Sequence, residues 1–92
     1  MIKAFRCHET AQIHSGRPSK RFGNIEQVAR RKLRMIEAAV MLYDLKAPPG
    51  NRLEALTGNR KGQHSIRVND QWRICFEWRD GNAYNVEIVD YH

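Results

Sequence analysis

Three functional groups of different chemistry lie together at the end of the sequence. Asp90, Tyr91 and His92 supply a carboxylate, a phenol and an imidazole, and we expect Arg67 and Arg73 nearby on the open face of the same sheet. This set fits a metal-free ribonuclease, which needs groups to accept the ribose 2′-OH proton and to protonate the leaving 5′-oxygen, and a cation for the phosphate. Histidine suits proton transfer because its pKa lies near neutrality, and the charged fork of arginine suits phosphate.

Purely structural roles are open for the same side chains. His92 would then be a frayed chain end and Tyr91 a core residue, while Arg73 would pair with Glu77 or Glu87. Chemistry alone therefore leaves a catalytic and a structural interpretation side by side, and the choice depends on where the strands put these residues.

The sequence predicts neither a metal site nor a cofactor site. Cys7 and Cys75 are far apart and no CxxC pair occurs, so we expect reduced thiols rather than a disulfide framework. The spacing of Cys7, His8 and His14 matches no common structural zinc pattern. A chain of this length is also too small to enclose a deep cofactor cavity, so chemistry is expected on a surface or in a cleft.

Composition predicts a single globular domain spanning residues 1–92, without a membrane span or secretion signal, so we expect a cytoplasmic protein. The net charge is +6 and the mean hydropathy is −0.69. Residues 1–46 hold ten basic and four acidic residues, whereas residues 47–92 hold six of each. This excess is typical of proteins that bind a polyanion such as RNA, and equally of a merely basic, soluble surface.

A short strand and two helices are expected in the first half. Residues 1–6 predict an imperfect strand, residues 8–14 one or two helical turns and residues 15–19 a loop. Helical spacing of apolar residues predicts a long helix over residues 25–44, with Asn24 as N-cap and Gln27 at the capping-box position. The prolines at 48 and 49 end it. Its outer face, which is either an RNA contact or simply solvated, carries Arg30, Arg31, Lys32 and Arg34.

An ordered loop and a three-strand antiparallel meander are expected in the second half. Residues 51–63 are polar and glycine-punctuated, with Leu53, Ala55 and Leu56 as core anchors. From residue 64 the apolar period changes to two, and the face with Trp72 and Trp78 should pack on the long helix. The opposite face is open to a ligand and carries Arg67, Arg73 and Glu77. The fold class is therefore α+β, with the N-terminal strand and the meander forming one sheet and both helices packed on one of its faces.

The most specific pattern occupies three separated segments. These are residues 48–56 (PPGNRLEAL), 62–73 (GQHSIRVNDQWR) and 86–92 (VEIVDYH), supported by residues 1–5 (MIKAF) and 29–33 (ARRKL). Over its whole length the chain resembles the HigB-type toxins of the RelE/ParE superfamily, the toxic halves of bacterial type II toxin–antitoxin pairs. It looks most similar to the GraT branch of that family.

This resemblance implies a RelE-like fold and a toxin that enters the decoding site of the 70S ribosome. Such a toxin cuts mRNA without a metal, leaving a 2′,3′-cyclic phosphate and a 5′-hydroxyl. The resemblance further implies proton transfer by His92 and stabilisation of the phosphate by Arg73. It assigns RNA holding or stacking to Tyr91 and the orientation of the other groups to Asp90.

The chain departs from some relatives in the loop before the meander. Those relatives carry a His and a Lys where this chain has Glu54 and Thr57. Either Glu54 serves as the base while a nearby cation supplies charge, or cleavage is slower. The residues implied as contacts to ribosomal RNA are Arg52, Arg60, Lys61 and Arg67, with the basic cluster of the long helix.

The resemblance also implies a protein partner. A HigA-like antitoxin with a helix-turn-helix would hold the toxin inactive, and operator DNA would be bound only through the complex. Two other functions remain open, a ParE-like toxin that poisons DNA gyrase and a non-catalytic module that binds RNA or the ribosome. Neither of these needs Asp90 and His92, so loss of activity on removing His92 would favour the nuclease.

Overall fold

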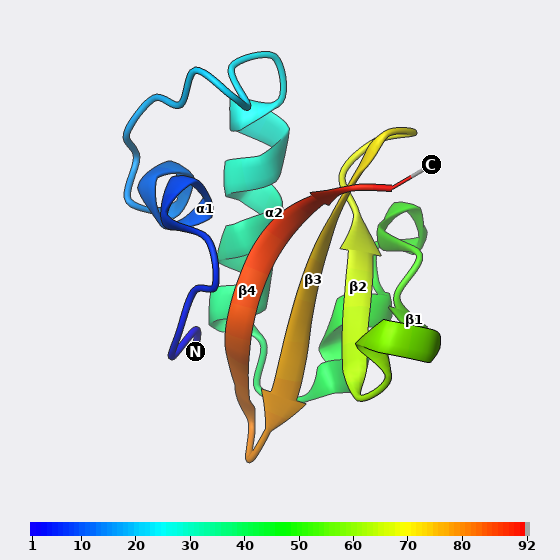
Figure 1. The fold of residues 1–92 in the computed structure, drawn as a ribbon. Helices are drawn as coiled ribbons and strands as arrows, with labels where there is room; N and C mark the ends of the chain where they lie inside the picture. The colour runs from blue at the N-terminus through cyan, green and yellow to red at the C-terminus, as the bar shows by residue number, and fades with distance from the viewer. Residues whose placement is uncertain (92) are drawn as a thin grey trace.

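The protein, seen in a computed structural model that describes residues 1–91, consists of a four-stranded antiparallel sheet and two helices. Figure 1 shows α2 against one face of the sheet and α1 beside the outer edge of β4. The helices are α1 (His8–His14) and α2 (Glu26–Ala38), with 3₁₀ turns η1 (Leu42–Lys46), η2 (Pro49–Asn51) and η3 (Gly58–Arg60). The strands, in spatial order, are β1 (Glu54–Ala55), β2 (Gln63–Arg67), β3 (Trp72–Arg79) and β4 (Asn82–Asp90). The predicted α+β architecture is confirmed.

The meander packs on α2 through its apolar face, as the alternating pattern predicts. Ile74 and Phe76 of β3 are fully buried and belong to one core cluster with Leu33 and Ile36 of α2. Trp72 is partly buried at the edge of this core, with its ring edge-on to a buried phenylalanine. Because alternate side chains of a strand point to opposite faces, the same packing turns the intervening residues of β3 toward the open face.

The N-terminal segment forms only part of the predicted strand. Ile2 and Phe5 make isolated parallel bridges to Ala83 and Val86 of β4, on the edge that β3 does not use. The hydrogen bonds include one from the amide of Lys3 to the carbonyl of Ala83, at 2.8 Å. The segment therefore extends the sheet without the continuous ladder of a regular strand.

A β-bulge in β4 interrupts the predicted alternation. Cys75 lies opposite Glu87, but Glu77 lies opposite Tyr84, so Phe76 faces two residues of β4 instead of one. One of these two, Asn85, has a φ of 53°, a left-handed conformation that asparagine tolerates better than most residues. The extra residue lets both Ala83 and Val86 face the core, where each is fully buried.

Helix α2 is shorter than predicted at both ends. It ends at Ala38 rather than at residue 44, because the carboxylate of Asp44 accepts hydrogen bonds from the amides of Val40 and Met41, at 3.0 and 2.9 Å. These bonds start η1 and lower the pKa of Asp44. The N-cap is Ile25 and its side chain makes no cap bond, so the prediction of Asn24 as N-cap is wrong. Within residues 1–91 no helix is long and apolar enough to cross a membrane.

Candidate active site

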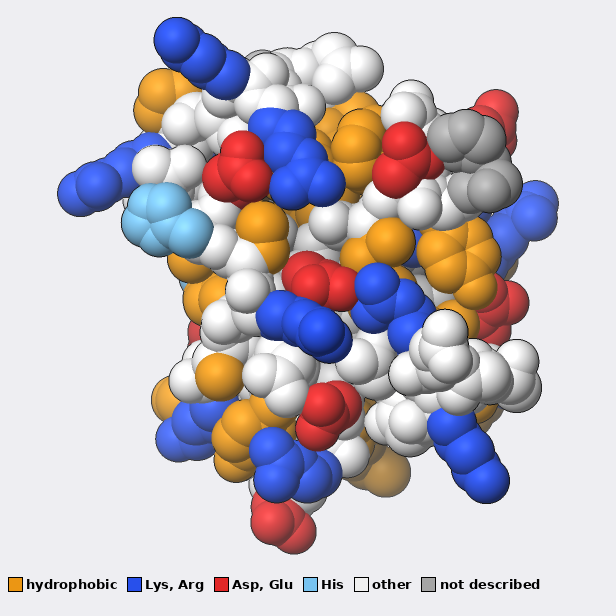
Figure 2. Space-filling model, viewed as in Figure 1, with side chains coloured by type: hydrophobic (Ala, Val, Ile, Leu, Met, Phe, Trp, Pro, Cys, Tyr) orange, Lys and Arg blue, Asp and Glu red, His pale blue; other side chains and the backbone are white. Residues whose placement is uncertain are grey.

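Arg73 lies in the middle of the open face of the sheet, with only 9% of its surface exposed. Figure 2 views this face, which carries basic and acidic side chains side by side. Burial of a charged group is costly unless hydrogen bonds compensate it. The contacts of the Arg73 guanidinium therefore decide what this residue can do.

Oxygen atoms of three residues surround that guanidinium. Nε donates to Ser65 Oγ at 2.8 Å, and Nη2 donates to the backbone carbonyl of Arg52 at 2.6 Å. Nη2 also lies 3.7 Å from Oε1 of Glu54, in an ion pair whose carboxylate side is about half exposed (48%). Glu54 comes to this position because β1 places it opposite Ser65 in the sheet. Neither Glu77 nor Glu87 pairs with Arg73, in contrast to the structural interpretation above.

A buried lysine holds the loop that carries the Arg52 carbonyl. Arg52 follows η2 in a left-handed conformation (φ 45°), and the preceding Asn51 is fully buried. The Asn51 amide donates to the carbonyl of Leu45 at 3.1 Å and accepts a short hydrogen bond from Nζ of Lys32. Lys32 was expected on the outer face of the helix, but it points inward. Burial, and then the charges of Arg31 and Arg67, lower its pKa.

The aromatic ring of Tyr91 lies beside Arg73. The ring centre is 5.5 Å from the guanidinium carbon, within the range of a cation–π contact. Tyr91 is 40% exposed, so the alternative interpretation as a core residue is wrong. Its amide donates to the carbonyl of Gln71, whose side-chain amide donates to Oδ2 of Asp90. His92 lies outside the described residues.

A shallow hollow borders Tyr91, and a second hollow adjoins the first. The first, of about 350 Å³, is lined by Arg60, Val89, Asp90 and Tyr91. The second shares the first three of these residues and continues toward Cys7 and Arg21. Arg60 is held between them by an ion pair with Glu87 at 2.9 Å and a hydrogen bond to Gln63.

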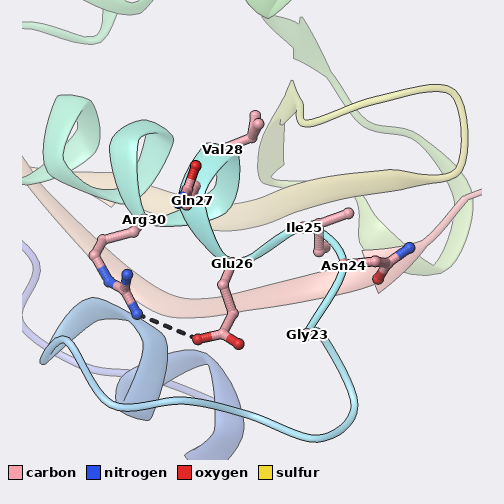
Figure 3. Close-up of a pocket in the computed structure, with 7 residues that line it drawn as sticks. All are labelled: Gly23, Asn24, Ile25, Glu26, Gln27, Val28 and Arg30. Carbon is pink, nitrogen blue, oxygen red and sulfur yellow. Dashed lines mark ion pairs between the residues drawn. The ribbon is translucent and has the colours of Figure 1, made fainter.

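The other predicted basic residues divide between two surfaces. Arg52 and Lys61 are exposed around β1, and Arg67 pairs with Asp70 in the turn before β3. Arg31 and Arg34 are exposed on α2, in the other layer of the molecule. Arg30 is held against α1, since its side chain donates to the carbonyl of Ile13 at 2.8 Å and pairs with Glu26 (Figure 3).

Ser65 was not predicted as a partner of Arg73. In the β2–β3 register Ser65 lies opposite Cys75, and Arg73 lies two residues before Cys75 in β3. Such diagonal neighbours touch when one side chain is long. The spacing of Ser65 and Arg73 on either side of the turn at residues 69–70 could therefore have indicated their contact. Within residues 1–91, no cluster of three or more His, Cys, Asp or Glu residues is arranged to hold a metal ion.

Comparison with known proteins identifies the family. Residues 4–92 match the family model of HigB-like toxins, described as the RelE-like toxin of the type II toxin–antitoxin system HigB. The chain belongs to the HigB-like toxins. It is 53% identical over 65 residues to Toxin HigB-1 of Vibrio cholerae, covering 71% of this chain and 68% of that one. It is 32% identical to Endoribonuclease HigB of Proteus vulgaris in an alignment of 98 positions that covers 100% of each chain.

Solved structures confirm the RelE-like fold of this HigB-like toxin. YafQ of E. coli aligns with a TM-score of 0.61 at 12% identity, covering 98% of this chain and 93% of that one. The YoeB–YefM complex of Staphylococcus aureus aligns at 0.53 and 15% identity, covering 100% and 98%. The predicted toxin family is thus confirmed, and a toxin of a type II system has an antitoxin as its partner. Similarity to the GraT branch stays a prediction.

Proposed function

We propose that this HigB-like toxin is an endoribonuclease that cuts mRNA on the 70S ribosome, with neither a metal ion nor a cofactor, and so stops translation. The observation that carries the proposal is the Arg73 guanidinium, buried but turned toward the exposed Tyr91 ring on the open face of the sheet. The full-length relation to a protein named endoribonuclease supports the same enzyme class. The products we expect are a 2′,3′-cyclic phosphate and a 5′-hydroxyl.

Each residue beside Arg73 has a proposed role in this reaction. Arg73 stabilises the additional negative charge on the phosphate as the 2′-oxygen attacks. The ring of Tyr91 stacks on a base of the mRNA, and His92, the next residue, transfers a proton. Asp90 orients this C-terminal segment, consistent with its hydrogen bond to Gln71.

Glu54 has two possible roles next to Arg73. As a general base it would take the 2′-OH proton while the cations of the loop, Arg52, Arg60 and Lys61, attract the RNA. As a charge partner only, it would leave Arg73 when phosphate arrives, and cleavage would depend on His92 alone for proton transfer. The 3.7 Å contact and the half-exposed carboxylate fit both roles, and a Glu54→Gln variant separates them (see Discussion).

Binding to the ribosome is assigned to basic residues around the site. Arg52, Arg60, Lys61 and Arg67 surround the open face and would contact ribosomal RNA through its phosphates. On α2, Arg31 and Arg34 form a second candidate surface, whereas Arg30 is engaged with α1. With the ribosome as its target, we expect the toxin to act in the cytoplasm.

The antitoxin is proposed to be HigA-like, with a helix-turn-helix that binds operator DNA as a complex with the toxin. An exposed apolar segment supports a protein contact after α2. Val40, Met41 and Tyr43 are 76%, 62% and 69% exposed, and large exposed apolar groups next to each other are typical of protein interfaces. We place the antitoxin on this segment.

Primer extension on a defined mRNA in a translating extract tests the proposal. Wild-type toxin and His92→Ala are compared with and without ribosomes. We expect new 5′ ends that require both ribosomes and His92. Cleavage of free RNA would move the target away from the ribosome, and no cleavage by folded protein would reject the nuclease and lead to a gyrase assay.

A further inference from the structure

Ser65 lies at the centre of the open face, in the strand between β1 and β3. Its backbone pairs with Glu54 on one side and Cys75 on the other, and its side chain is fully buried. We infer that Ser65 is a positioning residue, which holds Arg73 in the orientation that binds the scissile phosphate. This inference rests on the proposed nuclease function and adds a residue to its machinery.

Two neutral oxygen atoms set the plane of the Arg73 guanidinium. One is Ser65 Oγ, which accepts from Nε, and the other is the carbonyl of Arg52, which accepts from Nη2. The Ser65 carbonyl adds a longer contact to Nη2, at 3.4 Å. Since Nε and Nη2 lie along one edge of a planar group, two anchors on that edge prevent its rotation. Nη1 makes no hydrogen bond with any residue from 1 to 91 and can donate to a phosphate.

The hydroxyl of Ser65 orients Arg73 without neutralising it. A carboxylate at the same buried position would cancel the positive charge that the transition state needs. The carboxylate that does reach Arg73, that of Glu54, is half exposed and lies 3.7 Å away, where phosphate can replace it. Ser65 is therefore the permanent partner of Arg73 and Glu54 the exchangeable one.

A purely structural role for the hydroxyl makes a different prediction. Thr10 in α1 provides the comparison, because it is also fully buried and its Oγ1 accepts a hydrogen bond, from the amide of Ile88 at 3.0 Å. Removing either hydroxyl leaves a buried donor unpaired and destabilises the fold. If Ser65 acts through Arg73, however, only the Ser65 variant should slow the cleavage step.

The test is single-turnover cleavage of mRNA on programmed 70S ribosomes, with thermal unfolding recorded for each protein. The variants are Ser65→Ala, Ser65→Cys, Ser65→Thr, Thr10→Val, Arg73→Ala and the double variant Ser65→Ala with Arg73→Ala. We expect Ser65→Ala and Ser65→Cys to slow cleavage about tenfold with unchanged ribosome binding, and Ser65→Thr to keep most of the rate. In the Arg73→Ala background, Ser65→Ala should have no further effect.

The outcomes separate this inference from the proposed function. Wild-type rates in Ser65→Ala and Ser65→Cys would overturn the inference while the nuclease stands. The inference would also be overturned if Ser65→Ala lowered the cleavage rate equally in the presence and absence of Arg73. A loss of cleavage rate in Thr10→Val that matches the loss in Ser65→Ala would overturn it too. If Ser65→Ala does not fold, Ser65→Cys decides, because it keeps the volume and weakens only the acceptor. Failure of wild-type toxin to cut ribosome-bound mRNA would reject the proposed function itself, and the inference with it.

Discussion

The guanidinium carbon of Arg73 lies 5.5 Å from the centre of the Tyr91 ring, and the sheet repeats this pairing at its other end. There the guanidinium carbon of Arg79 lies 4.0 Å from the ring centre of Tyr84. The two pairs differ in burial, since the side chain of Arg73 is 11% exposed whereas that of Arg79 is 60% exposed. The sheet thus has one arginine–tyrosine pair at the proposed site and a second pair at its other end. Variants of the second pair can serve as controls for variants of the first.

Replacing Arg73 tests its role at the phosphate. Arg73→Lys keeps the charge but loses the planar fork and the hydrogen bonds of Nε and Nη2. We expect the rate constant of cleavage on the ribosome to fall about a hundredfold, the typical effect of losing one donor to a developing oxyanion. The matched Arg79→Lys variant should cleave at the wild-type rate. Equal losses in both variants would assign the effect to the fold rather than to the site.

Tyr91 can act through its ring or through its hydroxyl. If the ring stacks on a base, Tyr91→Phe should cleave normally, whereas Tyr91→Ala should raise KM about tenfold, since one stacking contact contributes about 1–3 kcal/mol. The measurement is the concentration dependence of cleavage on programmed ribosomes. Impairment of Tyr91→Phe to the level of Tyr91→Ala would show that the phenol, not the ring face, carries the function.

Glu54→Gln distinguishes the two proposed roles of that carboxylate. We expect cleavage to stay within about tenfold of wild type, because the arriving phosphate takes the place of Glu54 beside Arg73. Binding to the ribosome should become tighter at low salt, because one negative charge is removed from a site for a polyanion. Loss of cleavage by about a hundredfold or more would instead identify Glu54 as the general base.

The two cysteines should differ in reactivity. Cys75 is fully buried in β3, and burial raises the pKa of its thiol, whereas Cys7 is only half-buried. In the native protein we expect a thiol reagent to label Cys75 about a hundredfold more slowly than Cys7, because labelling of Cys75 requires local opening. In urea the two rates should converge. In a Cys7→Ser variant, fast labelling of Cys75 in the native protein would contradict the burial of that residue.

The raised pKa of Cys75 also predicts an alkaline loss of stability. Above the ordinary thiol pKa, the unfolded chain loses its proton while the folded chain keeps it, so ionisation favours unfolding. The stability that depends on the protonated Cys75 thiol is therefore fully present below the ordinary thiol pKa. It is lost as the pH rises toward the pKa of the thiol in the folded protein. The measurement is the free energy of unfolding in urea, near neutrality and at alkaline pH. It should fall less between the two pH values in Cys75→Ala than in wild type, and Cys7→Ser is the control.

The exposed segment after α2 predicts a separation of two functions. Met41→Ser and Tyr43→Ser change exposed side chains, so stability should shift by no more than about 0.5 kcal/mol and mRNA cleavage should be unchanged. Affinity for the cognate antitoxin, measured by titration calorimetry, should fall about tenfold or more. Lys20→Ser, another exposed substitution, is the control. Unchanged affinity in both apolar variants would place the antitoxin elsewhere.

Local patterns predicted the strands of the meander but not β1. Residues 51–63 were predicted as a loop with Ala55 as a core anchor, whereas Glu54 and Ala55 pair with β2 and are exposed. The period of two from residue 64 onward predicted β2, β3 and β4 because a strand with one buried face must alternate. The C-terminal residues and Arg73 stood out by residue type, since few side chains can move protons or bind phosphate at neutral pH. The positions where local pattern failed, such as the end of α2 at Ala38, are those where two local signals compete. There the Asp44 cap outweighs the continuing helical spacing of apolar residues.

Only the tertiary structure decided which groups meet at the site. Ser65, Arg52 and Glu54 reach Arg73 from other segments of the chain. Likewise Lys32, which the helical pattern put on a solvated face, points inward because the η2 loop brings Asn51 to it. Such pairings depend on strand register and on the path of loops, which are set by packing over the whole molecule and leave no periodic signal along the chain. The sequence by itself determined the meander strands and the reactive groups. The pairing of β1 with β2 and of β2 with β3 determined the partners of Arg73.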